Sequence, residues 1–129
     1  MISIMLVDDN PTFLASIRQF LATVAQARVV GEARDGLEAL ELAKSLRPDL
    51  MLLDVAMPHM NGLDVARSMQ AWPQAPRIVF LSMHDSTAYR EAARNVGALA
   101  FVGKADFVAE LLPIISGLVT TSSGNGATA

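Results

Sequence analysis

Three carboxylates in this sequence follow apolar runs. Asp8 and Asp9 come directly after ISIMLV, and Asp54 ends LMLLD. Two further polar groups have similar places, since Ser82 ends RIVFLS and Lys104 follows ALAFVG. A carboxylate in such a place is costly to bury unless a cation or hydrogen-bond donors accompany it. These five residues are therefore the first candidates for a site that does chemistry.

Apolar runs that could form strands separate longer stretches in which apolar residues recur every three or four positions. This alternation is typical of βα units. The runs at 2–7, 50–54 and 77–82 are apolar at nearly every position, as strands covered on both faces must be, whereas 27–33 is mixed and suits a sheet edge. The predicted strands are 2–7, 27–33, 50–54, 77–82 and 98–103.

Capping residues indicate where the intervening helices begin. The predicted starts are Asn10-Pro11, Asp35 with Glu38 in capping-box-like spacing, Asn61-Gly62, and Asp85 or Ser86, and Gly97 suits a helix end. A fifth helix is expected over about 105–118, with a kink or an early end at Pro113, because proline removes a backbone donor. The polar residues 119–129 are expected to form a flexible tail or the start of a linker.

Parallel strands joined by helices predict an α/β fold with an open, doubly wound sheet. In such sheets the ligand site lies beyond the carboxyl ends of the strands, so Asp8, Asp9, Asp54, Ser82 and Lys104 should converge there. One ammonium cannot balance three acids. A hard divalent cation with oxygen ligands would, and Mg²⁺ fits best.

Each of these residues also has a purely structural interpretation. Asp8-Asp9 could favour a helix N-terminus through its dipole, Ser82 could cap a turn, and Lys104 could be a solvated surface residue. Asp54 is harder to explain in this way, because turn residues rather than a helix start follow it. The joint placement at strand ends favours a shared site.

Composition narrows the classes of function. The 129 residues suit one domain, which at 52% apolar content can build a substantial core. A net charge of -3 offers no basic field, so this segment is not expected to bind nucleic acid. No cysteine is present and no apolar run approaches the ~20 residues of a membrane span, so we expect a cytoplasmic protein without a thiolate metal site.

Four segments together resemble the receiver domain of two-component response regulators. They are LVDDN at 6–10, LLDVAMPHMNG at 52–62, FLSMHD at 80–85 and AFVGK at 100–104. The resemblance covers about residues 1–118 and implies a flavodoxin-like five-stranded sheet of order 2-1-3-4-5 with five helices. LSMHD, and alanine instead of proline after the lysine, are similar to the nitrate-regulator type, whose members carry helix-turn-helix output domains.

The resemblance implies a role in signalling rather than an enzyme. Asp54 would attack the phosphohistidine of a sensor histidine kinase or phosphotransfer protein and accept its phosphoryl group. Mg²⁺ would be bound by Asp9, Asp54 and the backbone carbonyl of Ala56, with Asp8 acting mainly through water.

The resemblance also assigns the residues that would respond to the phosphoryl group. Lys104 and Ser82 would contact its oxygens, and Phe101 would be the aromatic switch that turns inward. The residues expected to shape the loop after the acceptor are Met57, Pro58 and Gly62. The output would be a change on the face of the fourth helix, fifth strand and fifth helix, with possible homodimerisation.

Two residues at the expected phosphoryl site leave the lifetime of the phosphorylated state open. Ala56 and Met83 both border it, and Met83 is larger than the residue common in receivers. Serine at position 82 keeps the hydroxyl of the usual threonine but lacks its methyl group, so the switch is expected to be less tightly gated.

Three alternatives differ from this interpretation in testable ways. A constitutive pseudo-receiver would lack an acid or the lysine, and neither is missing. A phosphatase of the haloacid dehalogenase type needs a second acid two residues after its nucleophile, where this chain has Ala56. A flavodoxin needs hydroxyls and amides after its first strand, and DDNP would repel the flavin phosphate.

Overall fold

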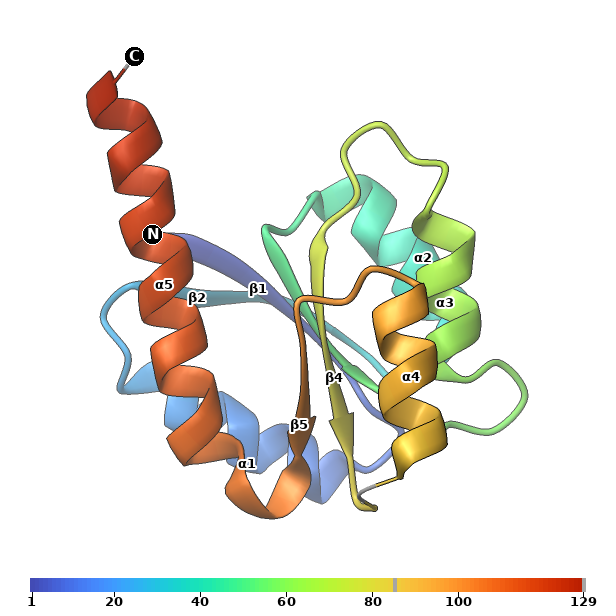
Figure 1. The fold of residues 1–129 in the computed structure, drawn as a ribbon. Coiled ribbons are helices and arrows are strands. Elements are labelled where there is room, and N and C mark those ends of the chain that lie inside the picture. Colours follow the sequence, from blue (N-terminus) through green and yellow to red (C-terminus); the bar gives the residue numbers. More distant parts are fainter. Residues whose placement is uncertain (85, 129) are drawn as a thin grey trace.

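Five parallel strands form one sheet in the order β2-β1-β3-β4-β5 (Figure 1). The computed structural model describes residues 1–84 and 86–128, with side chains described as far as residue 119. The strands are β1 (Ile2–Val7), β2 (Ala27–Ala33), β3 (Leu50–Asp54), β4 (Arg77–Ser82) and β5 (Ala100–Gly103). The predicted fold class and strand order are therefore confirmed, as is the edge position of residues 27–33.

Helices cover both faces of the sheet. Helices α1 and α5 lie on one face, and α2, α3 and α4 lie on the other (Figure 1). Their bounds are α1 (Pro11–Ala22), α2 (Gly36–Leu46), α3 (Gly62–Met69), α4 (Thr87–Asn95) and α5 (Phe107–Thr128), with a short 3₁₀ helix, η1 (Lys104–Asp106), before α5. This two-sided cover is why the central strands need apolar residues at consecutive positions.

The alternation of side chains along β3 divides the core into two clusters. Leu50 and Leu52 pack with the apolar residues of α1 and α5, whereas Met51 and Leu53 pack with those of α2, α3 and α4. All five residues of β3 are buried. The strand that ends in Asp54 is thus held from both faces, which fixes the backbone from which this carboxyl group projects.

Side-chain caps hold the first turns of the helices close to the carboxyl edge of the sheet. The Asn10 side chain accepts hydrogen bonds from the Thr12 and Phe13 amides, and Asn61 forms a reciprocal capping box with Asp64. Ser86 caps α4, while the alternative cap, Asp85, lies outside the described residues. The predicted starts of α1 and α3 are therefore found at the expected residues.

The second helix is capped slightly differently from the spacing that predicted it. Asp35 accepts from the Glu38 amide, as expected for an N-cap. The Glu38 carboxylate accepts from the amide of Arg34 rather than from that of Asp35. The reciprocal half of the box is thus displaced by one residue.

Helix α5 does not end at Pro113 but continues to Thr128. Proline at 113 removes the donor that would pair with the carbonyl of Ala109, and both residues are exposed, so water can solvate that carbonyl. The helix also continues past residue 118, where the sequence predicts the domain to end. The boundary at 118 and the linker role of 119–129 stay predictions.

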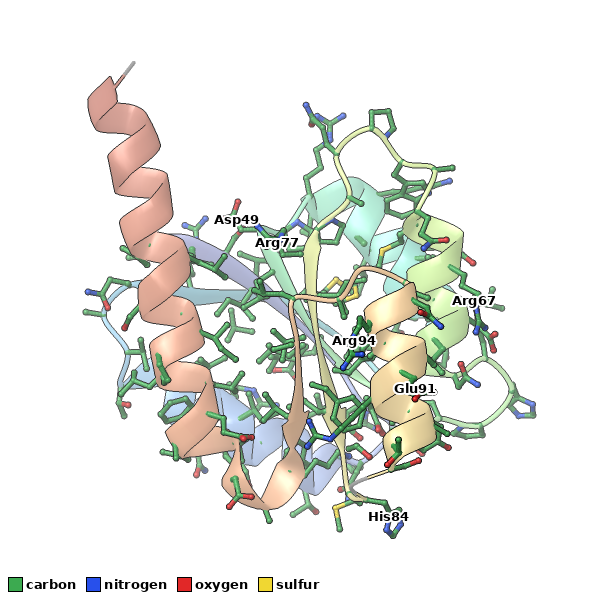
Figure 2. All side chains as sticks on the ribbon, in the orientation of Figure 1. Asp49, Arg67, Arg77, His84, Glu91 and Arg94 are labelled. Atoms are coloured by element: carbon green, nitrogen blue, oxygen red, sulfur yellow. The ribbon has the colours of Figure 1, made fainter. Side chains whose placement is uncertain are left out.

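Labelled residues in Figure 2 mark the two ends of the parallel strands. Figure 2 shows Asp49 and Arg77 at the amino ends of β3 and β4, and His84 beyond the carboxyl end of β4. The candidate site lies at the His84 end, where the carboxyl ends of the parallel strands meet.

None of the helices in the described part of the chain is long and apolar enough to cross a membrane.

Candidate functional site

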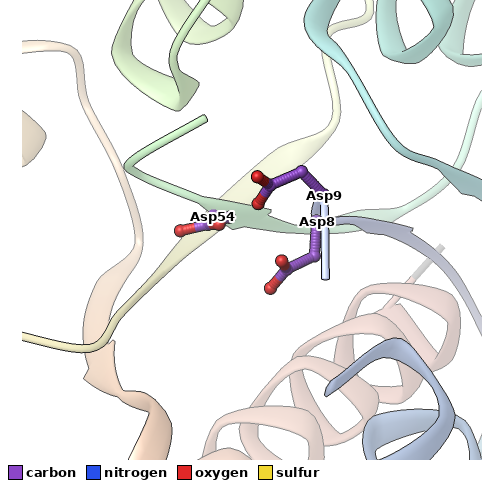
Figure 3. A group of neighbouring side chains, drawn as sticks. All are labelled: Asp8, Asp9 and Asp54. Atoms are coloured by element: carbon purple, nitrogen blue, oxygen red, sulfur yellow. The ribbon is translucent and has the colours of Figure 1, made fainter. Parts of the chain in front are cut away.

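Three carboxyl groups lie together just beyond β1 and at the end of β3 (Figure 3). One oxygen from each of Asp8, Asp9 and Asp54 lies within 4.8 Å of the others. Asp8 and Asp54 are buried, with 1% and 4% of their surfaces exposed, while Asp9 is exposed. The adjacent, parallel positions of β1 and β3 bring residues 8 and 54 together although 46 positions separate them in the sequence.

A buried ammonium group lies against two of these acids. The Lys104 Nζ is 2.7 Å from Asp8 Oδ2 and 3.4 Å from Asp54 Oδ2. Lys104 is the first residue of η1, directly after β5, so its side chain reaches back across the carboxyl edge of the sheet. One positive charge partly offsets the acids and leaves the group net negative.

Backbone amides fix the orientation of both buried carboxyl groups. The Asn10 amide donates to Asp8 Oδ1 at 2.8 Å, and the Ala56 amide donates to Asp54 Oδ1 at 3.1 Å. Each carboxyl group thus has one oxygen held by the chain and a second oxygen directed toward Lys104. The arrangement leaves Asp54 with an oriented oxygen at the edge of the sheet.

The environment of Asp54 opposes its ionisation. Burial raises the pKa of this carboxyl group and the nearby Asp8 charge raises it further, while Lys104 and the Ala56 amide lower it, with a net result of about 7 against an ordinary value of 3.8. A cation bound beside Asp54 would favour the ionised carboxylate. The ionised form is the one that acts as a nucleophile or a metal ligand.

The acids fit a divalent cation because they offer oxygen donors and because one buried oxygen accepts no hydrogen bond. Among the described side chains, Asp8 Oδ2 is a fully buried oxygen that accepts no hydrogen bond, although the Lys104 ammonium lies close to it. Oxygen donors from two or three carboxylates, completed by water or a carbonyl group, suit Mg²⁺. The Ala56 amide reaches Asp54, while the metal-binding role of its carbonyl stays a prediction.

Ser82 lies at the same edge but bonds within its own turn. Its hydroxyl donates to the His84 carbonyl at 2.7 Å and accepts from the His84 amide at 3.1 Å. Only 3% of the Ser82 surface is exposed. The capping interpretation of this residue therefore describes its hydrogen bonds here, and a phosphoryl role would require the hydroxyl to rotate.

The loop after Asp54 is held close to β3 by Gly62. A β-carbon at this position would lie 2.2 Å from the Asp54 carbonyl oxygen, so any larger residue would displace the loop or the strand. The Gly62 amide also donates to the Val55 carbonyl at 3.1 Å. Met57 is buried in the core, whereas Pro58 is exposed.

The predicted switch residue Phe101 lies in β5 and is half-buried. The Arg90 guanidinium of α4 lies over its ring, 4.9 Å from the centroid. Phe101 also packs against the cluster on the α2–α4 face. The contact joins α4 to β5, and its role in switching stays a prediction.

One aromatic residue at the site is absent from the sequence predictions. The Lys104 ammonium lies 4.6 Å from the centroid of the Phe13 ring in the first turn of α1. The sequence could have indicated that Phe13 lies near the acids, since the cap at Asn10 places residue 13 one turn into a helix that begins next to Asp8 and Asp9. The sequence does not show that this ring faces a lysine 91 positions later, because that contact depends on how α1 packs.

Comparison with known proteins agrees with this geometry. Residues 4–116 match the family described as the response regulator receiver domain. That match spans most of the chain, and the order of the strands and the acidic edge are in keeping with it. The chain belongs to the response regulator receiver domain family.

Related proteins include transcription regulators and a methylesterase. The chain is 39% identical over 97 residues to a probable transcriptional regulatory protein NarL of Mycobacterium tuberculosis, covering 75% of this chain and 45% of that protein. It is 38% identical over 104 residues to protein-glutamate methylesterase/protein-glutamine glutaminase 5 of Myxococcus xanthus, covering 80% of this chain and 30% of that protein. The chain thus spans less than half the length of either protein.

Solved structures show the same fold. The signal receiver domain of the putative response regulator NarL from Mycobacterium tuberculosis has a TM-score of 0.80 and 34% identity, over 90% of this chain and 97% of that chain. A LuxR-family two-component response regulator from Aurantimonas has a TM-score of 0.86 and 31% identity, over 94% and 86% of the two chains. The chain is therefore a receiver domain with neighbours of the NarL and LuxR type.

Proposed function

We propose that this receiver accepts a phosphoryl group on Asp54 from the phosphohistidine of a sensor histidine kinase or phosphotransfer protein. The observation that supports this most directly is the buried Lys104 ammonium beside Asp8 and Asp54, with an Asp9 oxygen within 4.8 Å of an oxygen of each of these two acids. Mg²⁺ would be held by Asp9, Asp54 and the Ala56 carbonyl, with Asp8 acting mainly through water. When bound, it neutralises charge on the transferring phosphoryl group.

The chemistry assigned to this chain is an in-line displacement. An ionised Asp54 oxygen attacks phosphorus, a P–O bond forms, and the P–N bond to the donor imidazole breaks, with the electron pair leaving on that imidazole. The amide of Ala56 holds one Asp54 oxygen and so presents the other to the donor. Lys104 is placed to offset the charge that the phosphoryl oxygens bring to the edge.

The phosphorylated state is proposed to act through the α4–β5–α5 face. A phosphoryl group on Asp54 offers new acceptor oxygens, for which the Ser82 hydroxyl must leave the His84 carbonyl. Movement of that turn would change the start of α4 and, through Arg90, the environment of Phe101. The expected output is a shift in population between two arrangements of this face.

The output partner is proposed from the relatives and not from this chain. One relative is a probable transcriptional regulatory protein, and the proposed output is therefore a DNA-binding domain joined to the receiver. The receiver itself is acidic overall and is not expected to bind DNA. Homodimerisation on phosphorylation and a cytoplasmic location belong to the same proposal.

A constitutive pseudo-receiver is the alternative within this family. That class needs no functional phosphoryl site, so its acids or its lysine are free to diverge. Here Asp8, Asp54 and Lys104 are all present and form the two ion contacts given above. The assembled site favours an active acceptor.

Intact-protein mass spectrometry after incubation with acetyl phosphate and Mg²⁺ tests the proposal. The wild type should gain the mass of one phosphoryl group, and a chelator should prevent the gain. Asp54→Asn should gain none, because the amide is not a nucleophile of this kind.

The matched control is Glu41→Gln, which removes an exposed carboxylate in the middle of α2. This variant should be phosphorylated like the wild type. A wild type that gains no phosphoryl group, or an Asp54→Asn variant that gains it equally, would overturn the proposed function.

A further inference from the structure

We infer that Phe13 is a positioning residue for Lys104, holding the ammonium group at the acidic edge through the face of its ring. The Lys104 Nζ lies over this ring, 4.6 Å from the centroid. The same ammonium also contacts Asp8 and Asp54. The role of Lys104 toward a phosphoryl group rests on the proposed function, whereas the positioning of its ammonium does not.

Two carboxylates alone do not define the position of this cation. Nζ is closer to Asp8 than to Asp54, at 2.7 Å against 3.4 Å, so the ammonium is drawn toward the acid that is not the proposed acceptor. The electron-rich face of an aromatic ring attracts a cation, and the attraction is larger in a desolvated site than at a surface. Phe13 thus supplies a neutral third contact that restricts the ammonium without adding charge to an acidic cluster.

The ring of Phe13 is itself held in orientation. Phe107, at the start of α5, contacts it nearly edge-to-face, with centroids 5.4 Å apart and an interplanar angle of 76°. Phe20, two turns further along α1, contacts the same Phe107 ring at 5.8 Å and 81°. Phe107 follows η1, the short helix that begins with Lys104, so the contact between Phe13 and Phe107 ties the segment that carries the lysine to the first turn of α1.

A purely structural role predicts a different pattern. Phe13 and Phe20 are both half-buried and both pack at the edge of the cluster between the sheet, α1 and α5. If apolar packing were the only role, shape would matter and ring electronics would not. If the ring positions the cation, withdrawing electrons from the Phe13 face should loosen Lys104, and the same change at Phe20 should not.

Lysine-selective NMR provides the first arm of the test, because the chain has only two lysines, Lys44 and Lys104. With ¹³C-labelled lysine, the Lys104 ε-methylene signal is assigned by its persistence in Lys44→Arg. In the wild type this signal should be shifted upfield by the Phe13 ring and should show restricted motion. Site-specific replacement of Phe13 by phenylalanines with increasing ring fluorination should progressively lower its order parameter.

The matched control for this arm is the same fluorination series at Phe20, whose ring contacts the same Phe107 ring. That series should leave the Lys104 signal and its order parameter unchanged. A Lys104 order parameter that is insensitive to fluorination at Phe13, or equally sensitive at both positions, would overturn the inference.

The second arm measures the rate of phosphorylation by acetyl phosphate at saturating Mg²⁺. Phe13→Leu, which keeps an apolar side chain but lacks the ring face, should be slower by about three- to tenfold, and Phe20→Leu should match the wild type. In a Lys104→Met background, Phe13→Leu should cause no further slowing. Additional slowing in that background would contradict a role exerted through Lys104.

The two arms separate this inference from the proposed function. A wild type that is not phosphorylated removes the proposed function, and the NMR arm still decides whether Phe13 positions the ammonium. If the wild type is phosphorylated but the Lys104 order parameter does not change with fluorination at Phe13, the proposed function stands and the inference is wrong.

Discussion

Asp54 joins two properties that rarely coincide in one residue. Its backbone belongs to a strand buried on both faces, and its side chain lies at the sheet edge beside another acid. The first property makes the carboxyl group rigid, and the second makes its ionised form costly without a cation. A carboxyl group of this kind is held in position while its charge depends on what binds beside it.

The raised pKa of Asp54 has a consequence for stability. The folded protein holds the Asp54 proton up to about pH 7, whereas the unfolded chain releases it near the ordinary pKa of 3.8. Between these values the folded state binds more protons, so the free energy of unfolding should fall as pH rises through this window without metal. Mg²⁺ should reduce the fall, because it stabilises the ionised carboxylate.

Urea unfolding at several pH values measures this effect. Subtracting the result for Asp54→Asn removes the contribution of carboxyl groups common to both proteins. The wild type should lose stability relative to Asp54→Asn as pH rises from about 4 to about 7 in the presence of a chelator. A difference that does not change over this range would show that Asp54 ionises without hindrance.

Residue-level prediction from the sequence succeeded for position and left the hydrogen bonding of Ser82 open. The strand pattern placed Asp8, Asp54 and Lys104 at one edge, and the structure brings them into contact. The bonds of Ser82 within its own turn match one of the two interpretations that the sequence left open, and the sequence alone could not choose between them. The ring beneath Lys104 could not be predicted, because it depends on a helix packing angle that periodicity does not contain.

At the scale of elements, the start of α3 determines how close the loop after Asp54 can lie to β3. Gly62→Ala would introduce a β-carbon 2.2 Å from the Asp54 carbonyl oxygen. The expected loss is about 1–3 kcal/mol in the free energy of unfolding, the usual range for overpacking, together with slower phosphorylation, because Asp54 would move with its carbonyl.

Urea unfolding and the rate of phosphorylation measure both effects of Gly62→Ala, and Gly117→Ala is the matched control. Gly117 lies within α5, and an added β-carbon there would meet no described atom within 4 Å. Alanine also favours a helix over glycine, so this variant should be at least as stable as the wild type and be phosphorylated at the same rate. Equal stability of the two variants would contradict the close approach of Gly62 to β3.

Element boundaries were predictable where a side chain marks them. Asn10 and Asn61 have cap chemistry that defines a start, and both helices begin directly after them. Helix α5 had no such mark at its end. Pro113 indicated a break, yet an exposed turn tolerates the missing donor, and the helix continues.

At the scale of the molecule, the strand order is what makes a site from scattered residues. β1 and β3 are neighbours at the centre, so their carboxyl ends place acids side by side, and β4 and β5 follow on one flank with Ser82 and Lys104. The same flank leads to α4 and α5. A change of charge at Asp54 is thereby close to the face proposed for output, without any long path through the core.

We propose that Asp54, and no other acid of the cluster, carries the phosphoryl group. Borohydride reduces an acyl phosphate to an alcohol, so treatment of the phosphorylated protein should convert the acceptor aspartate to homoserine, which peptide mass spectrometry can locate. We expect homoserine at residue 54 only, and its formation should depend on Mg²⁺ and on the phosphoryl donor. Homoserine at Asp8 or Asp9, or none at residue 54 in a protein that has gained the phosphoryl mass, would contradict it.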